Sequence, residues 1–274
     1  MRSFRTSPTE TGRVLSAALA GLLACLVLAG CASGTGGAAG ADPGRALSDA
    51  LELGRAGRRV TTMAARGELN LRRDGSTHYF RFELTARKPG DFVFTVMDPL
   101  GRPAARVAVA GGDFLSLEYG PRLASAGEAV PETLGRFLPL GLRPEDFLAI
   151  LSGVLVPEPA GATYASGKLR VAGAGFWSGS TWTVGTGSGP DGPRLERFAV
   201  LGSDGEAFSG SYSRFESVVS QDTGESVSFP RTVVVDWGAG RSLAVRYDEV
   251  ALGFAPPAGA FSTAVPAGFR MVPL

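Results

Sequence analysis

Apolar and polar residues alternate along much of the chain after Gly67. The segment Phe80–Ala86 is the clearest example, because arginine, glutamate and threonine separate its aromatic and aliphatic residues. A period of two is typical of a β-strand with one buried face. Glycine, proline, aspartate or serine bounds each stretch, which indicates hairpin turns. The predicted strands contain Leu69–Leu71, Phe80–Ala86, Phe92–Val96, Val107–Val109, Leu115–Tyr119, Lys168–Ala172, Thr181–Gly185, Arg194–Leu201, Ala207–Val219, Arg231–Trp237 and Ser242–Leu252.

Two regions have helical rather than strand spacing. Apolar residues in Leu47–Gly54 fall on one helical face, which predicts a short N-terminal helix. The second region is Pro131–Gly153, where the apolar residues of Leu134–Leu138 suit one short helix. Pro144 in a first turn, two acidic residues after it and a glycine at position 153 frame another helix. The strands therefore fall into two groups, before and after this helical interruption.

These elements predict a mainly β (α+β) protein built on one curved antiparallel sheet. About ten or eleven strands with hairpin connections and two short internal helices favour an incomplete barrel, whose open side the helices cover. The 39 glycines and 18 prolines agree, since they favour strands and turns over long helices. We expect this unclosed half-barrel to occupy residues 45–274, with an apolar concave face.

The N-terminal residues have the pattern of an export signal. Three arginines precede an uncharged apolar run, Val14–Gly30, as in a secretory signal peptide. The run is short for a membrane span and has no basic flank after it. The tetrapeptide Leu28–Cys31 looks like a bacterial lipobox, in which the cysteine is acylated after cleavage. We therefore expect a signal peptide at 1–30, and lipid on Cys31 followed by a flexible Gly/Ala tether at 31–44.

Charge and reactive residues argue against several functions. The 27 basic and 26 acidic residues nearly cancel, which disfavours nucleic-acid binding. Cys25 lies in the expected signal peptide and Cys31 is expected to carry lipid, so the mature chain would have no disulfide. Hydrolase triads and most metal sites need more than the single His78. The acidic pairs Glu145–Asp146 and Asp248–Glu249 cannot converge on a substrate, since adjacent side chains diverge. We expect no enzyme activity, no catalytic residue, no metal site and no cofactor.

Several short motifs follow one another between Gly67 and Val250. They are the loop Asp98–Gly101, the segment Phe137–Leu140 leading into Pro144, the segment Phe147–Gly153, and Thr181–Thr183. In this order, after a lipobox and one N-terminal helix, they resemble the LolB family of outer-membrane lipoprotein receptors. They resemble more loosely the LolA-type carriers that share the LolA/LolB fold. After Val250 the chain departs from the receptor pattern, with a tail more like those of carrier-type or mycobacterial lipid-binding relatives.

The resemblance implies a function in lipoprotein localization. An apolar cavity would take the acyl chains of a lipoprotein handed over by a LolA-like periplasmic carrier. A membrane-insertion loop formed by Pro99, Leu100 and Gly101 would help place this cargo in the membrane. Ala32 after the acylated cysteine implies sorting to the outer membrane, with the domain in the periplasm. The alternative to a membrane-insertion role is that Leu100 is a turn residue folded back into the core.

The expected cavity is lined by the apolar faces of the strands and of the second helix. Its residues are Phe80, Phe82, Phe92, Phe94, Val107, Leu115, Leu117, Phe147, Leu151, Trp182 and Val184. Such a surface offers contact area for acyl chains without a charge to orient a polar substrate. Aromatic stripes at strand spacing can equally be ordinary core. Three functions therefore stay open: a receptor that inserts lipoproteins, an anchored carrier of lipid or another hydrophobic ligand, and a scaffold with a filled barrel.

Overall fold

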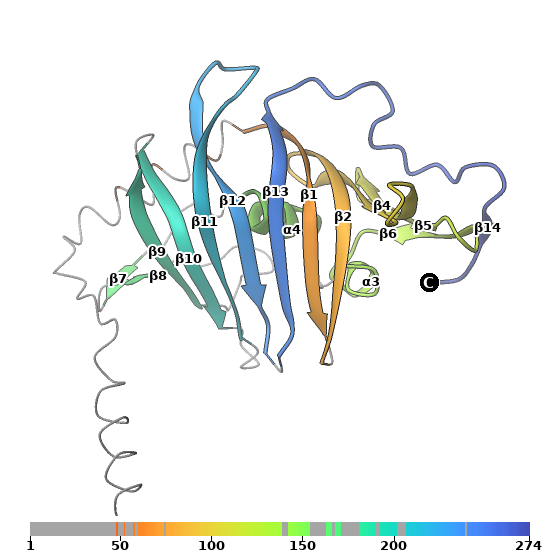
Figure 1. Ribbon diagram of the computed structural model, residues 1–274, viewed down its shortest axis with the longest axis horizontal. Coiled ribbons are helices and arrows are strands. Elements are labelled where there is room, and N and C mark those ends of the chain that lie inside the picture. The colour runs from red at the N-terminus through yellow and green to blue at the C-terminus, as the bar shows by residue number, and fades with distance from the viewer. Residues whose placement is uncertain are drawn as a thin grey trace, which may run out of the picture. The chain divides into compact units, whose positions relative to one another are not determined.

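The strands of the protein join into one open sheet, which the ribbon diagram of the computed structural model shows (Figure 1). Its 14 strands have the order β14-β6-β5-β4-β3-β2-β1-β13-β12-β11-β10-β9-β8-β7. The structure describes residues 48, 52, 57, 60–73, 75–138, 142–153, 163–165, 168–170, 181–189, 192–201, 207–238 and 240–274. In chain order the strands are β1 (Thr62–Arg73), β2 (Ser76–Arg87), β3 (Asp91–Met97), β4 (Pro103–Ala110), β5 (Asp113–Glu118), β6 (Leu123–Glu128), β7 (Thr163–Ala165), β8 (Lys168–Arg170), β9 (Thr181–Gly189), β10 (Gly192–Leu201), β11 (Ala207–Val219), β12 (Ser226–Asp236), β13 (Ser242–Leu252) and β14 (Arg270–Met271).

Hairpins connect most neighbouring strands of the sheet. The strands β1 to β6 form one antiparallel meander and β7 to β13 form another, and the two join where β1 pairs with β13. The exception is β14, which pairs in parallel with β6 at one edge. Within the described residues, no ladder joins the two edge strands β14 and β7. The unclosed, mainly antiparallel sheet confirms the predicted fold class.

The sheet has more strands than the alternation predicted, and the extra ones have a physical reason. The strand β6 carries the sequence LASAGE, whose small residues give no hydrophobic period. The strands β7 and β14 have only 3 and 2 residues, which is too short for any period to appear. The compact unit Asp42–Leu274 contains all of these strands and is separate from Met1–Ala41. The buried core residues of the described part of the chain lie within the same unit.

Two short helices interrupt the strands within the predicted helical region Pro131–Gly153, and the first of them lies earlier than predicted. They are α3 (Pro131–Leu134) and α4 (Pro144–Ser152). Each begins with a proline at a position whose missing N–H costs nothing, and α4 ends at Gly153, whose φ of 70° permits the left-handed cap. The helix expected at Leu47–Gly54 lies mostly outside the described residues. Among the described residues, no helix is both long and apolar enough to span a bilayer.

Helix α4 packs on the concave face of the sheet and fills part of it. Phe147 meets Phe92 with ring centroids 5.3 Å apart and meets Phe94 edge-on at 6.4 Å. Two buried tyrosines hold the C-terminal end of the helix, because the Tyr212 hydroxyl donates to the Ile150 carbonyl (3.1 Å) and the Tyr247 hydroxyl donates to the Leu151 carbonyl (2.7 Å). These carbonyls belong to the last turn, where a helix leaves its acceptors without internal partners. Strands β11 and β13 thus fix the position of α4.

The outer face of strands β4 to β6 carries a second, smaller apolar cluster. It consists of Ala108, Leu115, Leu117 and Ala124, with Val93, Tyr119 and Phe269 packed against it. The C-terminal segment 253–274 returns from β13 to β14 across this part of the molecule (Figure 1). Phe269 meets Tyr119 edge-on at 5.5 Å, and Phe261 lies under the Arg87 guanidinium at 4.9 Å. The tail therefore covers apolar surface that an open sheet would otherwise expose.

A close backbone approach explains one glycine in the middle of β1. At Gly67 the pairing of β1 with β13 shifts by one residue. A Cβ atom at this position would lie 2.0 Å from the Arg246 carbonyl oxygen. Only glycine fits there without moving the backbone of β13.

Candidate functional site

An apolar cavity of about 930 Å³ lies at one end of the first meander. Strands β1 to β5 and the segment after α3 form its walls. The apolar lining residues are Leu69, Leu71, Phe80, Phe94, Val96, Val107, Phe137 and Leu138. The charged lining residues are Asp98, Arg102, Arg106, Glu118 and Arg136. Predominantly apolar walls with a few charged groups are typical of a site for an apolar or amphipathic molecule.

Cross-strand pairing brings the apolar walls onto one face. Phe94 pairs with Val107, Val96 pairs with Ala105, and Leu69 pairs with Phe80. Directly paired residues point to the same side of a sheet. Phe94 also stacks on Phe82, with ring centroids 5.3 Å apart. Phe94 therefore stands at the boundary between the packed core under α4 and the cavity beyond it.

The structure separates the expected cavity residues into four groups. Phe80, Phe94 and Val107 line the cavity. Four others are buried in the main core: Phe82, Phe92, Phe147 and Leu151. Leu115 and Leu117 belong to the small cluster on the opposite face. Trp182 and Val184 lie in β9, but their side chains are outside the described part of the structure.

This distribution of the residues has two physical causes. Helix α4 lies directly on Phe92 and Phe94, so the concave face beneath it is packed core and only the part beyond the helix stays open. In β5 both faces are apolar, because the C-terminal tail covers the outer one. The cavity side of β5 carries Ser116, and not Leu115 or Leu117.

Several cavity residues were not singled out from the sequence as lining residues. Leu69 and Leu71 alternate on one face of β1 and Val96 continues the face of Phe94, so the period of two could have found them. Phe137 and Leu138 follow α3 in an irregular segment. The helical spacing of Leu134, Phe137 and Leu138 predicted a helix through these residues, but α3 ends at Leu134, so Phe137 and Leu138 lie in the turns after it.

The turn between β3 and β4 forms a well-ordered loop beside the cavity. Asp98 organises it, because its carboxylate accepts hydrogen bonds from the backbone N–H groups of Leu100 (2.8 Å) and Arg102 (2.9 Å) and from the Arg102 side chain (2.8 Å). The hydrogen bonds from Arg102 hold the pKa of Asp98 below its usual value. Gly101, with a φ of 76°, supplies the left-handed residue.

This loop turns its leucine outward. Leu100 is 76% exposed, and its neighbours Pro99 and Gly101 are also exposed. Asp98 and Arg102, at the base of the loop, both line the cavity. The loop thus places an exposed leucine next to an apolar cavity.

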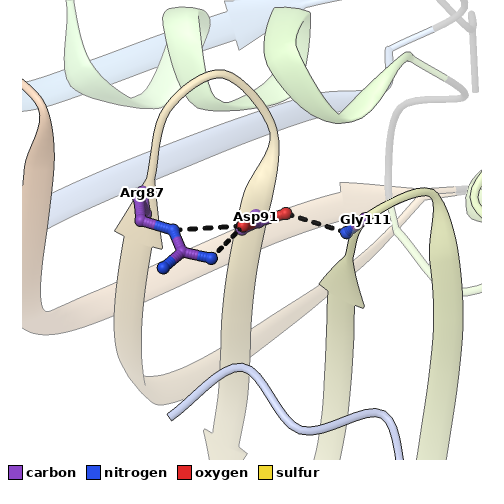
Figure 2. Close-up of polar contacts among 3 residues, drawn as sticks. All are labelled: Arg87, Asp91 and Gly111. Atoms are coloured by element: carbon purple, nitrogen blue, oxygen red, sulfur yellow. Dashed lines mark hydrogen bonds and ion pairs between the residues drawn. The ribbon is translucent and has the colours of Figure 1, made fainter. Parts of the chain in front are cut away.

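The opposite end of the same strands is fastened by polar contacts (Figure 2). Arg87, at the end of β2, binds the Asp91 carboxylate through Nη2 at 2.6 Å and Nε at 3.1 Å. The other oxygen of Asp91 accepts a hydrogen bond from the Gly111 N–H at 3.0 Å, so one carboxylate links the β2–β3 and β4–β5 turns. The two hairpins are therefore tied together at the end far from the cavity.

Comparison with solved structures identifies the fold. A LolA superfamily protein from Nitrosomonas europaea superposes with a TM-score of 0.50 at 11% identity, covering 78% of this chain and 96% of the other. A DUF1329 family protein from Desulfovibrio piger gives 0.53 at 12% identity over 81% and 98%. A domain described as an outer membrane lipoprotein-sorting protein, from Vibrio parahaemolyticus, gives 0.52 at 12% identity over 77% and 95%. The chain therefore shares its fold with these three structures.

The LolA-type fold is shown by structure alone. No protein-family model matches the sequence, and no curated protein matches it either. The shared fold is the one that the motif resemblance implies, but it does not single out LolB. Proteins of one fold can differ in function, so the function must come from the cavity and the loop.

The described residues contain no cluster of three or more histidine, cysteine, aspartate or glutamate side chains that could hold a metal ion. Burial raises the pKa of Tyr212 and Tyr247, and both hydroxyls are engaged with helix α4. Burial lowers the pKa of Lys88 from 10.5 to about 8, and its ammonium donates to the Gly57 carbonyl at 2.5 Å. These groups have structural partners and do not face the cavity.

Proposed function

We propose that this protein is an outer-membrane lipoprotein that binds the acyl chains of other lipoproteins and helps to insert them into the outer membrane. The observation that carries the proposal is the cavity of about 930 Å³ with apolar walls. Its volume falls in the range of about 300–1,000 Å³ that is usual for ligand sites. A scaffold with a filled barrel would not need such a space, since protein interiors are otherwise closely packed.

In this proposal the loop beside the cavity is the membrane-insertion element. Leu100 is exposed at its tip, and the Asp98 hydrogen bonds keep the loop in one conformation. A leucine held in water at 76% exposure gains free energy when it enters an apolar phase. Acyl chains leaving the cavity would therefore meet the membrane at Leu100.

The anchor and the location belong to the same proposal. Cys31 would carry the lipid and residues 32–44 would tether the domain on the periplasmic side of the outer membrane. The cargo would be acylated lipoproteins, delivered by a LolA-like periplasmic carrier, and no enzymatic step is involved. This location is supported by the similar solved structure from Vibrio parahaemolyticus, a domain described as an outer membrane lipoprotein-sorting protein.

An anchored carrier of lipid or another hydrophobic ligand is the second candidate. The C-terminal tail favours it, because the tail covers the small outer cluster through Phe269 and extends beyond the LolB-like pattern. A carrier needs the cavity but does not need Leu100. The two candidates therefore differ in what the loop does.

The first experiment tests the cavity. Native mass spectrometry with organic extraction would identify any acylated molecule that the unit Asp42–Leu274 carries, and titration with a fluorescent fatty acid would measure its affinity. Val96→Trp should reduce acyl binding at least tenfold, because the indole occupies the cavity. Ser213→Trp adds the same side chain on the exposed outer face of β11 and should have no effect. An empty protein that ignores fatty acids would refute the acyl-binding proposal.

The second experiment separates the receptor from the carrier. Leu100→Glu should abolish lipoprotein insertion and leave acyl binding intact, since Leu100 does not line the cavity. Val219→Glu is a matched control, because Val219 is also exposed (60%) but lies at the far end of β11. Normal lipoprotein sorting in the Leu100→Glu variant would exclude the receptor and favour the carrier.

A further inference from the structure

Three hairpin turns meet at the cavity end of the sheet. The strands β1 to β6 alternate in direction, so the β1–β2, β3–β4 and β5–β6 turns all lie at this end. The lower ends of β1 and β2 in Figure 1 show where it is. Tyr79 and Leu100 both lie beyond the Arg81–Met97 pair of β2 and β3, and each is 76% exposed. An exposed aromatic residue near the start of β2 and an exposed aliphatic residue in the β3–β4 turn thus lie at this end of the sheet.

Several arginines lie in or beside the same three turns. The described ones are Arg72, Arg73, Arg102 and Arg122, and the described carboxylates there are Asp98 and Glu118. Asp74 adds one acidic residue in the sequence between β1 and β2. Asp98 is already paired with Arg102 at 2.7 Å. The surface therefore carries a net positive charge, in a protein whose total charge is only +1.

Two of these arginines are well placed to bind an external anion. Arg72 and Arg122 are exposed and make no ion pair with any described residue. Neither arginine lines the cavity, so a role in holding the acyl chain does not explain them.

We propose that this end of the sheet docks on a bilayer that contains anionic phospholipids. The guanidinium groups of Arg72 and Arg122 bind lipid phosphates, and Tyr79 enters the interfacial layer beside Leu100. Arginine binds phosphate in a two-pronged geometry, and tyrosine partitions favourably to the headgroup region. Separate turn tips suit a deformable lipid surface better than a protein partner, which needs about 800 Å² of fitted surface.

This inference rests on the proposed function and adds to it the lipid class and the orientation of the protein. Docking through these turns would hold the mouth of the cavity against the headgroups. The charge also makes an ionic-strength dependence necessary, since exposed charges are screened over about 10 Å at 0.1 M salt.

Vesicle flotation of the unit Asp42–Leu274 tests the proposal. We expect binding to phosphatidylcholine vesicles that contain phosphatidylglycerol, little binding to pure phosphatidylcholine, and loss of binding at about 1 M salt. Replacing both Arg72 and Arg122 with glutamine should weaken the partition of the protein to these anionic vesicles about thirtyfold, because each arginine contributes about fivefold. The control variant with Arg197→Gln and Arg214→Gln removes the same charge from β10 and β11 and should change the partition to anionic vesicles little.

Tyr79→Ser should also weaken binding to the anionic vesicles, with the two arginines in place. Equal partition to neutral and anionic vesicles, or equal losses in the two arginine pairs, would overturn the docking proposal. Unchanged vesicle binding in the Arg72 and Arg122 variant, with weaker capture by a periplasmic carrier protein, would overturn it in favour of a protein partner. Circular dichroism of each variant checks that the sheet is intact.

Fatty-acid titration of the same proteins separates this inference from the proposed function. The variant lacking Arg72 and Arg122 should bind the fluorescent fatty acid as the original does, because neither residue lines the cavity. If the original protein docks on anionic vesicles but binds no fatty acid, the proposed function fails while the docking proposal stands. If it binds fatty acid but shows no preference for anionic vesicles, the docking proposal alone fails.

Discussion

The hydrogen bond from Tyr247 to helix α4 gives a sharp test of how the concave face is held together. Tyr247→Phe keeps the aromatic ring, which meets Phe82 at 5.8 Å and Phe229 at 5.4 Å, and removes only the hydroxyl. That hydroxyl donates to the Leu151 carbonyl at 2.7 Å, and both residues are buried. The substitution leaves a helix-terminal carbonyl without a partner in an apolar environment.

The expected loss follows from the two parts of this change. The net contribution of one hydrogen bond is about 1 kcal/mol, and a buried carbonyl without a partner adds a desolvation cost of similar size. We therefore expect the free energy of unfolding to fall by about 2 kcal/mol. Tyr212→Phe removes the neighbouring hydrogen bond to Ile150. The double variant should lose less than the sum of the single losses, because both tyrosines hold the same helix end.

Urea unfolding followed by circular dichroism measures these losses. Tyr119→Phe is the matched control, since Tyr119 packs against Phe269 and its hydroxyl has no hydrogen bond within the described part of the chain. We expect the control to change stability by less than about 0.5 kcal/mol. A loss in Tyr247→Phe no larger than that of the control would refute the idea that the tyrosines fix α4. Hydrogen exchange at the C-terminal end of α4 should rise in Tyr247→Phe and stay unchanged in the control.

Three further substitutions test other parts of the structure. Gly67→Ala should destabilise the protein by about 2 kcal/mol or more in urea unfolding, because the new Cβ would lie 2.0 Å from the Arg246 carbonyl oxygen. The pKa of Lys88 falls from 10.5 to about 8 on folding, so the folded protein binds fewer protons than the unfolded chain between these values. Stability should therefore rise from about pH 8 to about pH 10, by an amount that solvent screening at this exposed side chain reduces, and Lys88→Met should remove this rise. Phe269→Ala should cost about 2 kcal/mol of stability and leave fatty-acid binding unchanged, because Phe269 packs on the face opposite the cavity.

For each of these three predictions, one experimental result would contradict it. Gly120→Ala is the control for Gly67, since a Cβ there meets nothing within 4 Å, and equal effects would show that the close approach in β1 is unimportant. A flat pH profile for the original protein would mean that Lys88 is solvated. Weaker fatty-acid binding in Phe269→Ala would show that the tail and the cavity are coupled across the sheet.

The sequence predicted the strands well where one face of the strand is buried and the other is exposed to solvent. Strand β2 shows this, since the alternation over Phe80–Ala86 is the burial pattern that the structure has. The same argument failed in β5, where Leu115 and Leu117 are as apolar as Phe114 because both faces are covered. Alternation cannot say which face of such a strand is inner. That decision comes from the C-terminal tail, which packs there from far along the chain.

The cavity was harder to predict than the sheet for a related reason. Phe92 and Phe94 lie on the same face of β3, yet Phe92 is fully buried and only Phe94 lines the cavity. The difference arises from where α4 comes to rest, and this depends on contacts with Tyr212 and Tyr247, which lie far along the chain. Periodicity describes faces, whereas a cavity is what remains after the covering elements are placed. The exposed tip at Leu100 was easier to predict, because its turn is local in sequence.

The pairing of β1 with β13 has a consequence for the order of folding. Met63 pairs with Leu252, so the seam between the two meanders joins strands from almost opposite ends of the chain. The first meander can form locally during synthesis, but its β1 edge stays unpaired until β13 has emerged. An unpaired edge strand can add a strand from another molecule. A chain that ends before β13 would therefore expose two unpaired edge strands, β1 and β12. We expect such truncated chains to aggregate rather than to fold as half-sheets.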